Sequence, residues 1–429
     1  LINVSRETAS LLARDEQWLH LYEDLTPTAL HKLTERLAEL PVRPLISVLL
    51  PVYNTPEIWL RQAIESVRAQ VYQEWELCIA DDASTVAHIR PLLEEAALSD
   101  ARIKIVFREK NGHISHASNS ALALAGGEFI ALLDHDDELA PHALAEMALA
   151  LSRQSDADLL YSDEDKIDEQ GRRFAPYFKP AFLPDLFLGQ NYLTHLAVYR
   201  ATLVRAVGGF RPGFEGSQDW DLALRVIAQT TADRVVHIAK LLYHWRAIPG
   251  STALTLDQKN YHGAAAQRAL QEHLTRTGQV ATLSQVIGGH WRVIYSLPTP
   301  PPLVSIIIPT RNGVRHLRRC LDSLRAKTSY PHYEIIVIDN DSDDAATLAY
   351  LREIAATGVQ VLPYAQPFNY SAINNFAANH AVGEILALLN DDLEVITPNW
   401  LEEMAAQALR PEIGCVGAML YYPHDSIQH

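Results

Sequence analysis

Along residues 45–133, segments whose apolar residues have helical spacing alternate with short apolar runs typical of strands. Leu60, Ile64 and Val67 recur on one face of a predicted helix, and residues 116–125 form a second, short helix of small side chains. Four runs are almost wholly apolar, as in strands buried on both faces: 45–50, 77–80, 103–107 and 129–133. This alternation predicts an α/β fold, with a mostly parallel sheet flanked by helices.

Residues 1–40 have a different pattern, which predicts a helical N-terminal extension that packs on the domain after it. The apolar residues recur at roughly helical spacing: Leu11, Leu12, Trp18, Leu19, Tyr22, Leu30, Leu33 and Leu37. Acidic and basic side chains are mixed between them. A helix lying on a membrane surface favours a basic polar face, so that alternative is disfavoured.

The strand and helix pattern begins again after a stiff, proline-rich linker at residues 298–302. The offset is 258 residues between Pro51 and Pro309 and 256 between Gly127 and Gly383. A nearly constant offset predicts an internal duplication. We expect a complete domain over 41–297 and the N-terminal, nucleotide-binding part of a second domain over 303–429.

Composition and charge narrow the function classes. The chain has 429 residues, enough for two domains, and a net charge of −16, which argues against a protein that binds duplex nucleic acid. Three cysteines without a CxxC pair disfavour a disulfide framework or a zinc site and fit a reducing compartment. No signal peptide or apolar run of 18 residues is visible. We therefore expect a cytoplasmic location. Because residue 1 is Leu, we also expect the natural N-terminus to lie upstream.

The strongest chemical signal is the acidic cluster 134–137, which follows the apolar run 129–133 directly. Asp134 and Asp136, two positions apart at a strand end, can converge on one divalent cation. Such a cation can stabilise the charge of a leaving diphosphate. The alternative is an acidic turn before a helix near Pro141.

Residues 45 to about 255 resemble the family 2 glycosyltransferases, which adopt the GT-A fold. Residues 303–429 resemble the first half of that fold. The motifs that carry the resemblance are Val48–Asn54, Ala80–Ser84, Ala131–Asp137, and Gly208–Phe210 followed by Gln218–Asp221 and Arg225. Residues 368–375 resemble the donor-side helix of bacterial polysaccharide-assembling relatives, rhamnosyltransferases among them.

This resemblance implies roles for several residues at the donor site. Tyr53 and Asp82 would contact the nucleobase and ribose, with the backbone around Pro51 close by. Asp134 and Asp136 would bind the metal and the nucleotide diphosphate.

Asp219 matches the acidic residue that serves as the catalytic base in the family, although Gln218 stands where the family usually has Glu. Inverting transfer independently needs a base on the face opposite the leaving group, one that the metal does not occupy. Asp219 suits that role because it belongs to a different element from the acidic cluster. Two alternatives stay open: Asp219 caps a helix, or Asp221 is the base.

Five further residues are weaker candidates. His244 resembles a third metal ligand, and a site with histidine favours Mn²⁺ over Mg²⁺. Arg246 could hold the diphosphate, and His195 and Trp220, with Gln218 beside them, could line the acceptor cleft. For each, structural packing or an exposed loop is the alternative.

The second copy has counterparts for only part of this site. The donor-side residues of the first copy correspond in the second to Pro309, Asn340, Asn390 and Asp392, with Asn340 in place of Asp82. No counterpart of Asp219 or His244 is present, and the preserved acidic triplet favours a chain cut within the second copy over a degenerate domain. The replacement by Asn340 suggests that the two copies use different nucleotides or sugars.

The sequence thus predicts an inverting glycosyltransferase that depends on Mn²⁺ or Mg²⁺. Its partners would be a nucleotide-sugar donor and a growing saccharide or lipid-linked acceptor at the cytoplasmic membrane face, where the protein would associate peripherally. A sugar nucleotidyltransferase is one rival, although the glycine-rich basic loop it needs is missing after the first strand. A catalytically silent carbohydrate-binding or scaffold module is the other.

Overall fold

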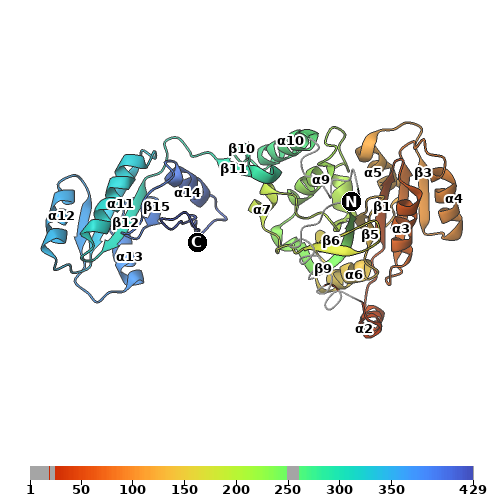
Figure 1. The fold of residues 1–429 in the computed structure, drawn as a ribbon, viewed down its shortest axis with the longest axis horizontal. Helices are drawn as coiled ribbons and strands as arrows, with labels where there is room; N and C mark the ends of the chain where they lie inside the picture. Colours follow the sequence, from red (N-terminus) through yellow and green to blue (C-terminus); the bar gives the residue numbers. More distant parts are fainter. Residues whose placement is uncertain (1–18, 20–24, 249–259, 429) are drawn as a thin grey trace. The chain divides into compact units, whose positions relative to one another are not determined.

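The computed structural model describes residue 19 and residues 25–248 and 260–428 (Figure 1). The chain divides into two compact units. The first comprises Leu1–Gln279 and Leu283–Val293, and the second comprises Val280–Thr282 and Ile294–His429. Among the helices described, none combines the length and the apolar character needed to cross a membrane.

The first unit is built on a nine-stranded sheet of order β3-β2-β1-β4-β8-β6-β9-β5, with β7 paired to β6. The strands are β1 (Ile46–Val52), β2 (Trp75–Asp81), β3 (Ile103–Phe107), β4 (Phe129–Leu132), β5 (Glu138–Leu139), β6 (Leu159–Ile167), β7 (Arg173–Tyr177), β8 (Ala197–Arg200) and β9 (Val235–Arg246). Strands β1 to β4 are parallel, whereas β8 runs antiparallel to both β4 and β6. The α/β prediction is confirmed, with the four apolar runs as the four parallel strands.

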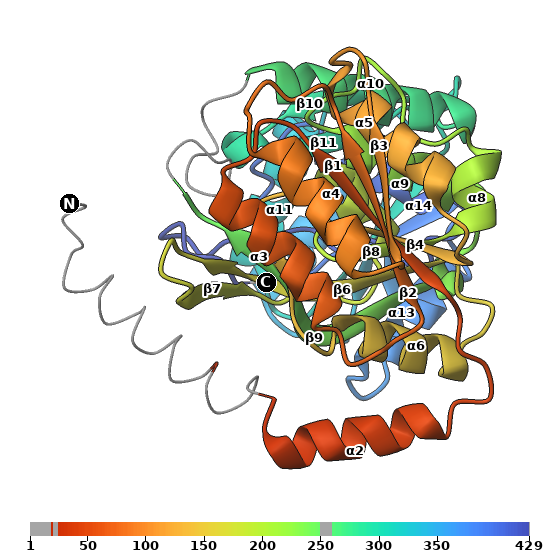
Figure 2. The same ribbon diagram turned by 90° about the vertical axis from the view of Figure 1, so that its right-hand side faces the viewer.

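Helices cover both faces of this sheet. The helices described in this unit are α2 (Pro27–Ala38), α3 (Glu57–Arg68), α4 (Ile89–Ser99), α5 (His113–Leu124), α6 (Ala143–Arg153), α7 (Pro184–Gly189), α8 (Ala201–Ala206), α9 (Gln218–Ile227) and α10 (Asn260–Arg276), with 3₁₀ turns at Ala232–Arg234 and Ile287–Gly289. Helices α3, α4 and α6 share one apolar core with β1, and Figure 2 shows α3 and α4 lying along the strands.

Helix α2 lies in the predicted N-terminal extension. Thr26 caps it by accepting a hydrogen bond from the backbone of Ala29 at 3.2 Å. Leu33 and Leu37 are buried in the core of the first unit, so the predicted packing is found for these two residues. The prediction for residues 1–18 and 20–24 lies outside the described residues.

The second unit repeats the first four strands in the same order, as β14-β13-β12-β15. Its elements are β12 (Val304–Thr310), α11 (Val314–Lys327), β13 (Tyr333–Asp339), α12 (Ala345–Ala355), β14 (Gln360–Pro363), α13 (Tyr370–Ala378), β15 (Ile385–Leu388) and α14 (Trp400–Ala408). All pairings in this sheet are parallel. A separate hairpin joins β10 (Ala281–Gln285) to β11 (Trp291–Tyr295).

One buried hydrogen-bond arrangement occurs in both units. The Ser47 hydroxyl donates to Glu76 at 2.6 Å and accepts from the backbone of Gly127 at 2.9 Å. The same bonds, at 2.5 and 2.8 Å, join Ser305, Glu334 and Gly383. The two units share this strand order and these polar contacts, and the duplication itself remains a prediction.

Candidate active site

The carboxyl ends of β1, β2 and β4 meet at one edge of the first sheet, because these neighbouring strands are parallel. Tyr53 follows β1, Asp82 follows β2 and Asp134 follows β4. Ligands of such sheets bind at this edge. The Tyr53 side chain is available there, with 46% of the residue exposed.

Asp82 lies at this edge but is buried, and its carboxylate already has partners. Arg108 Nε donates to it at 2.7 Å, and the backbone N–H of Gly112 donates at 3.0 Å. Asp82 thereby fixes the loop that follows β3. The predicted contact of Asp82 with a nucleotide remains a prediction.

The acidic turn after β4 is fastened to the end of β9. The Tyr243 hydroxyl donates to Asp137 at 2.6 Å, and the backbone N–H of Arg246 donates to the other Asp137 oxygen at 2.7 Å. Arg246 Nε donates to the backbone carbonyl of Asp136 at 2.6 Å. Asp137 is therefore buried and shapes the turn, while 45% of the Asp134 side chain stays exposed.

Three side chains at this turn could hold a divalent cation. Ligand atoms of Asp134, Asp137 and His195 all lie within 4.8 Å of one another, and His195 Nε2 is 3.7 Å from Asp134 Oδ2. Two carboxylates and an imidazole suit Mn²⁺ or Mg²⁺. The pKa of Asp134 is raised, chiefly by desolvation despite the partial exposure of its side chain, and further by the charges of Asp136 and Asp219.

Glu164 on β6 orients His195. Its carboxylate lies 3.2 Å from His195 Nδ1 and also accepts a hydrogen bond from the His195 backbone, which leaves Nε2 turned toward Asp134. The imidazole stacks on Tyr243 with 4.6 Å between ring centroids. Burial lowers the pKa of His195, but the hydrogen bond to Glu164 and the nearby carboxylates outweigh this and raise it to about 9.

Glu164 is one of three consecutive buried carboxylates on β6, a feature that the sequence analysis missed. Each contacts a histidine of another segment: Asp163 with His237, Glu164 with His195, and Asp165 with His244. The signal was present in the sequence, since three acidic residues in a row follow an apolar strand start at 159–161. Buried charges need partners, so this run indicated several cationic or histidine neighbours.

His244 lies on a different side of β9 from the acidic turn. Its Nδ1 is 2.6 Å from Asp165 Oδ1, while the adjacent Tyr243 reaches Asp137. Successive side chains of a strand point to opposite faces. The structure therefore does not bring His244 into the cluster of Asp134 and His195.

Arg246 is fully buried beneath the acidic turn. Its guanidinium pairs with Glu138 and stacks over Trp59, with 4.2 Å to the ring centroid. These contacts, together with the bond to the Asp136 carbonyl, make Arg246 a support of the turn. Its predicted contact with a diphosphate remains a prediction.

Asp219 lies in the first turn of α9, and its charge contributes to the raised pKa of Asp134. Asn191 Nδ2 donates to Asp219 Oδ2 at 2.8 Å. Asp221, the competing base, is buried and accepts from both Arg211 and Arg225, so its carboxylate is structural.

The two residues flanking Asp219 have local partners. Gln218 accepts a hydrogen bond from the backbone of Gly216 at 2.7 Å. Trp220 is buried, donates to the Phe187 carbonyl at 3.2 Å and packs edge-on against the Phe187 ring. Trp220 thus belongs to the core, and acceptor contacts of Gln218 and Trp220 remain predictions.

The second unit has the corresponding strand ends with different chemistry. Asn340 is buried like Asp82, but its amide donates to the carbonyls of Tyr364 and Gln366 at 3.0 and 2.8 Å. Pro309 is half-buried in β12, and Asn390 and Asp392 are exposed after β15. In the first unit, Asp82 fixes the loop after the third strand through Arg108. In the second unit, Asn340 holds the corresponding loop through its backbone carbonyls.

Comparisons with known proteins agree with this architecture. The family model "Glycosyl transferase family 2" matches residues 47–208 and 305–428. An uncharacterized protein of Sinorhizobium fredii, y4gI, is 49% identical over 402 residues, which are 93% of this chain and 44% of that protein. The O-antigen biosynthesis protein RfbC of Myxococcus xanthus is 41% identical over 406 residues, or 94% of this chain and 31% of RfbC.

Both relatives are longer proteins, of which this chain spans less than half. Among solved structures, S. aureus TarS 1–349 in complex with UDP-GlcNAc superposes with a TM-score of 0.42 at 21% identity. That match covers 54% of this chain and 72% of TarS 1–349.

Proposed function

Because the chain belongs to glycosyl transferase family 2 and is therefore a glycosyltransferase, we propose that its first unit transfers a sugar from a nucleotide-sugar donor with inversion at the anomeric carbon. The observation that carries this proposal is the pair Asp134 and Asp219. The charge of Asp219, on a different element, contributes to the raised pKa of Asp134, and of these two carboxylates Asp134 is the one in the cluster with the His195 imidazole. Asp219 is thus left for proton transfer.

Asp134 and Asp136 would hold Mn²⁺ or Mg²⁺, with His195 as the nitrogen ligand in preference to His244. The ligand atoms that lie together are those of Asp134, Asp137 and His195, so Asp136 is included from the sequence prediction. Glu164 directs His195 Nε2 toward Asp134, and a bound cation would displace the proton of that nitrogen. A cation bound there supplies positive charge that stabilises the leaving nucleoside diphosphate.

The remaining steps fall to side chains of the protein. Asp219 takes the proton of the acceptor hydroxyl as that oxygen attacks the anomeric carbon, and Asn191 holds the carboxylate in place. The exposed ring of Tyr53 offers the nucleobase a stacking surface at the same edge. Arg246 keeps the acidic turn in position from below.

The biological role follows from the named relative. RfbC is described as an O-antigen biosynthesis protein, so the proposed acceptor is a growing cell-surface polysaccharide or lipid-linked saccharide. The protein would act in the cytoplasm, peripherally on the inner membrane. The second unit, with its nucleotide-side residues, would bind a different donor, as Asn340 in place of Asp82 suggests.

A panel of nucleotide sugars with Mn²⁺, scored for release of nucleoside diphosphate, tests the proposal. We expect one donor to be turned over and Asp219→Asn to reduce kcat by about 10²–10⁴. Asp156→Asn, at an exposed position of the same unit, should leave the rate unchanged. With a saccharide acceptor added, proton NMR of the glycoside formed should show an anomeric configuration inverted relative to the donor.

Full activity of Asp219→Asn would refute the assignment of the base. Release of a nucleoside triphosphate and a sugar 1-phosphate when pyrophosphate is added to the nucleotide sugar would favour the nucleotidyltransferase alternative. Donor binding without turnover of any donor or acceptor would favour a silent module.

A further inference from the structure

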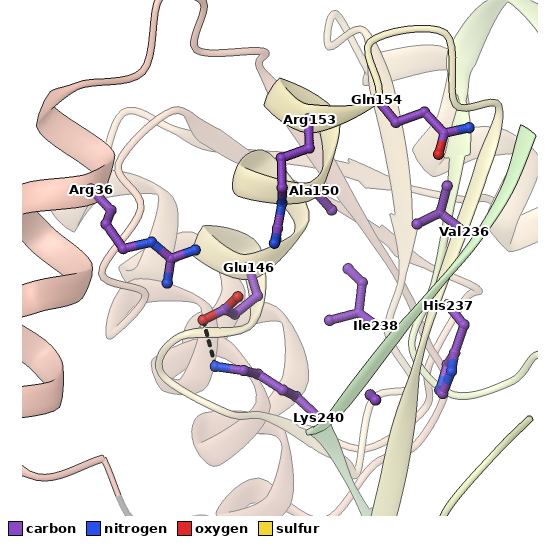
Figure 3. Close-up of a pocket in the computed structure, with 10 residues that line it drawn as sticks. Arg36, Glu146, Ala150, Arg153, Gln154, Val236, His237, Ile238 and Lys240 are labelled. Carbon is purple, nitrogen blue, oxygen red and sulfur yellow. Dashed lines mark hydrogen bonds and ion pairs between the residues drawn. The ribbon is translucent and has the colours of Figure 1, made fainter. Parts of the chain in front are cut away.

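A groove with a volume of roughly 430 Å³ opens on the first unit, lined by α2, α6 and β9 (Figure 3). Its charged lining residues are Arg36, Glu146, Arg153 and Lys240, and residues 236–240 of β9 form one wall. These residues of β9 belong to its first half, 236–240, whereas the acidic turn contacts its end, 243–246. The groove is therefore separate from the candidate active site.

The charge of this groove differs from that of the whole chain. Its lining holds three cations and one carboxylate, in a protein of net charge −16. The carboxylate, Glu146, is buried and is paired with Lys240 at 2.8 Å. Within the ranges that the structure describes, neither Arg36 nor Arg153 forms an ion pair. Figure 3 shows both arginine side chains reaching toward the Glu146–Lys240 pair.

Two exposed guanidinium groups from different helices thus converge on one concave surface, whose one carboxylate, Glu146, is already paired with Lys240. Guanidinium groups bind phosphate through paired hydrogen bonds. Ala150, Val236 and Ile238 add an apolar wall beside them. The volume also lies within the range of small-molecule sites, about 300–1,000 Å³.

We propose that this groove binds the phosphate group of a second ligand, distinct from the sugar donor. Arg36 and Arg153 contact the phosphate, and the apolar wall contacts the group that it carries. The source of the phosphate is either a soluble phosphate ester or a phospholipid headgroup.

Titration calorimetry with inorganic pyrophosphate tests whether the ligand is a soluble phosphate ester. The buffer contains a metal chelator, which removes metal-dependent binding at the acidic turn. We expect the double variant Arg36→Gln/Arg153→Gln to bind pyrophosphate at least about tenfold more weakly than the unmodified protein. Arg61→Gln, an exposed arginine of α3 in the same unit, is the matched control and should bind normally. Circular dichroism confirms that each variant is folded.

Sedimentation with phosphatidylglycerol vesicles tests the lipid source, with phosphatidylcholine vesicles as the neutral comparison. If the unmodified protein binds the anionic vesicles and the double variant does not, the proposal is supported and the ligand is a phospholipid headgroup. Loss of pyrophosphate binding alone would support it and identify a soluble ester. If the double variant matches the unmodified protein in both measurements, or if neither probe binds, the proposal is wrong. Neither result depends on transferase activity, so the proposed function is tested separately.

Discussion

The side-chain amide of Asn191 donates a 2.8 Å hydrogen bond to Oδ2 of Asp219. Asn191 follows α7, and Asp219 lies 28 residues later in the first turn of α9, so tertiary folding brings them together. The bond fixes the orientation of one carboxylate oxygen and leaves Oδ1 for another partner.

Asn191→Ala should lower kcat by about tenfold and change KM for the donor little, because it loosens the proposed base without touching the donor site. Asn191→Asp should lower kcat further, since it places a second negative charge against Asp219. Steady-state kinetics with a saturating donor measures both effects. If both variants keep the unmodified kcat, Asn191 does not position the base.

Replacing His195 should affect metal binding more than replacing His244. His195→Ala should weaken Mn²⁺ binding, measured in the presence of nucleoside diphosphate, by about tenfold or more, because it removes a nitrogen next to Asp134. His244→Ala should have a smaller effect, since that ring faces Asp165. The opposite order of affinities would restore His244 as the ligand and exclude His195.

The buried residue after the second strand of each unit should not be exchangeable between the units. Asp82→Asn removes the charge that pairs with Arg108 and should cost about 1–3 kcal/mol of stability. Asn340→Asp places a buried carboxylate against two backbone carbonyls and should be at least as destabilising. Denaturant unfolding of both variants measures this. Unchanged midpoints would show that neither side chain is held as described.

Stability should fall as the pH drops below 6.5, in part because of His142. Burial, and next the charge of Lys240, lower the pKa of His142 to about 4. Between pH 6.5 and 4 the unfolded chain binds a proton at this residue that the folded chain does not, so up to about 3 kcal/mol is lost.

His142→Phe should therefore flatten the dependence of the unfolding midpoint on pH over this range, whereas His116→Phe, at an exposed position, should not. An unaltered pH dependence in His142→Phe would contradict the buried, neutral state of this histidine.

Gly127 and Gly383 occupy equivalent positions with no room for a methyl group. A Cβ at Gly127 would lie 2.6 Å from the Leu45 carbonyl, and one at Gly383 would lie 2.7 Å from the Leu303 carbonyl. Each change to Ala should cost about 1–3 kcal/mol in thermal or denaturant unfolding. Gly414→Ala, with open space around it, is the control and should be neutral. Tolerance of Ala at only one of the two positions would argue against equivalent packing.

The parallel strands of both units were predictable because they depend on local sequence. The apolar runs at 45–50 and 303–308 have the length and composition of buried strands wherever they occur, and they became β1 and β12. The place of Asp134 at the edge of the sheet followed as well, since it comes directly after such a run.

The partners of the polar side chains were decided by the tertiary structure. The sequence offered His244 as a metal ligand and His195 as a residue of the acceptor cleft. The pairing of β6 with β9 instead places His244 against Asp165, and His195 lies beside Asp134. Arg246 and Trp220 carry groups suited to ligands, yet both are buried by elements distant in sequence. The apolar pattern of a strand depends on residues that are neighbours in the sequence, whereas the direction and burial of a side chain depend on which distant segment folds against it.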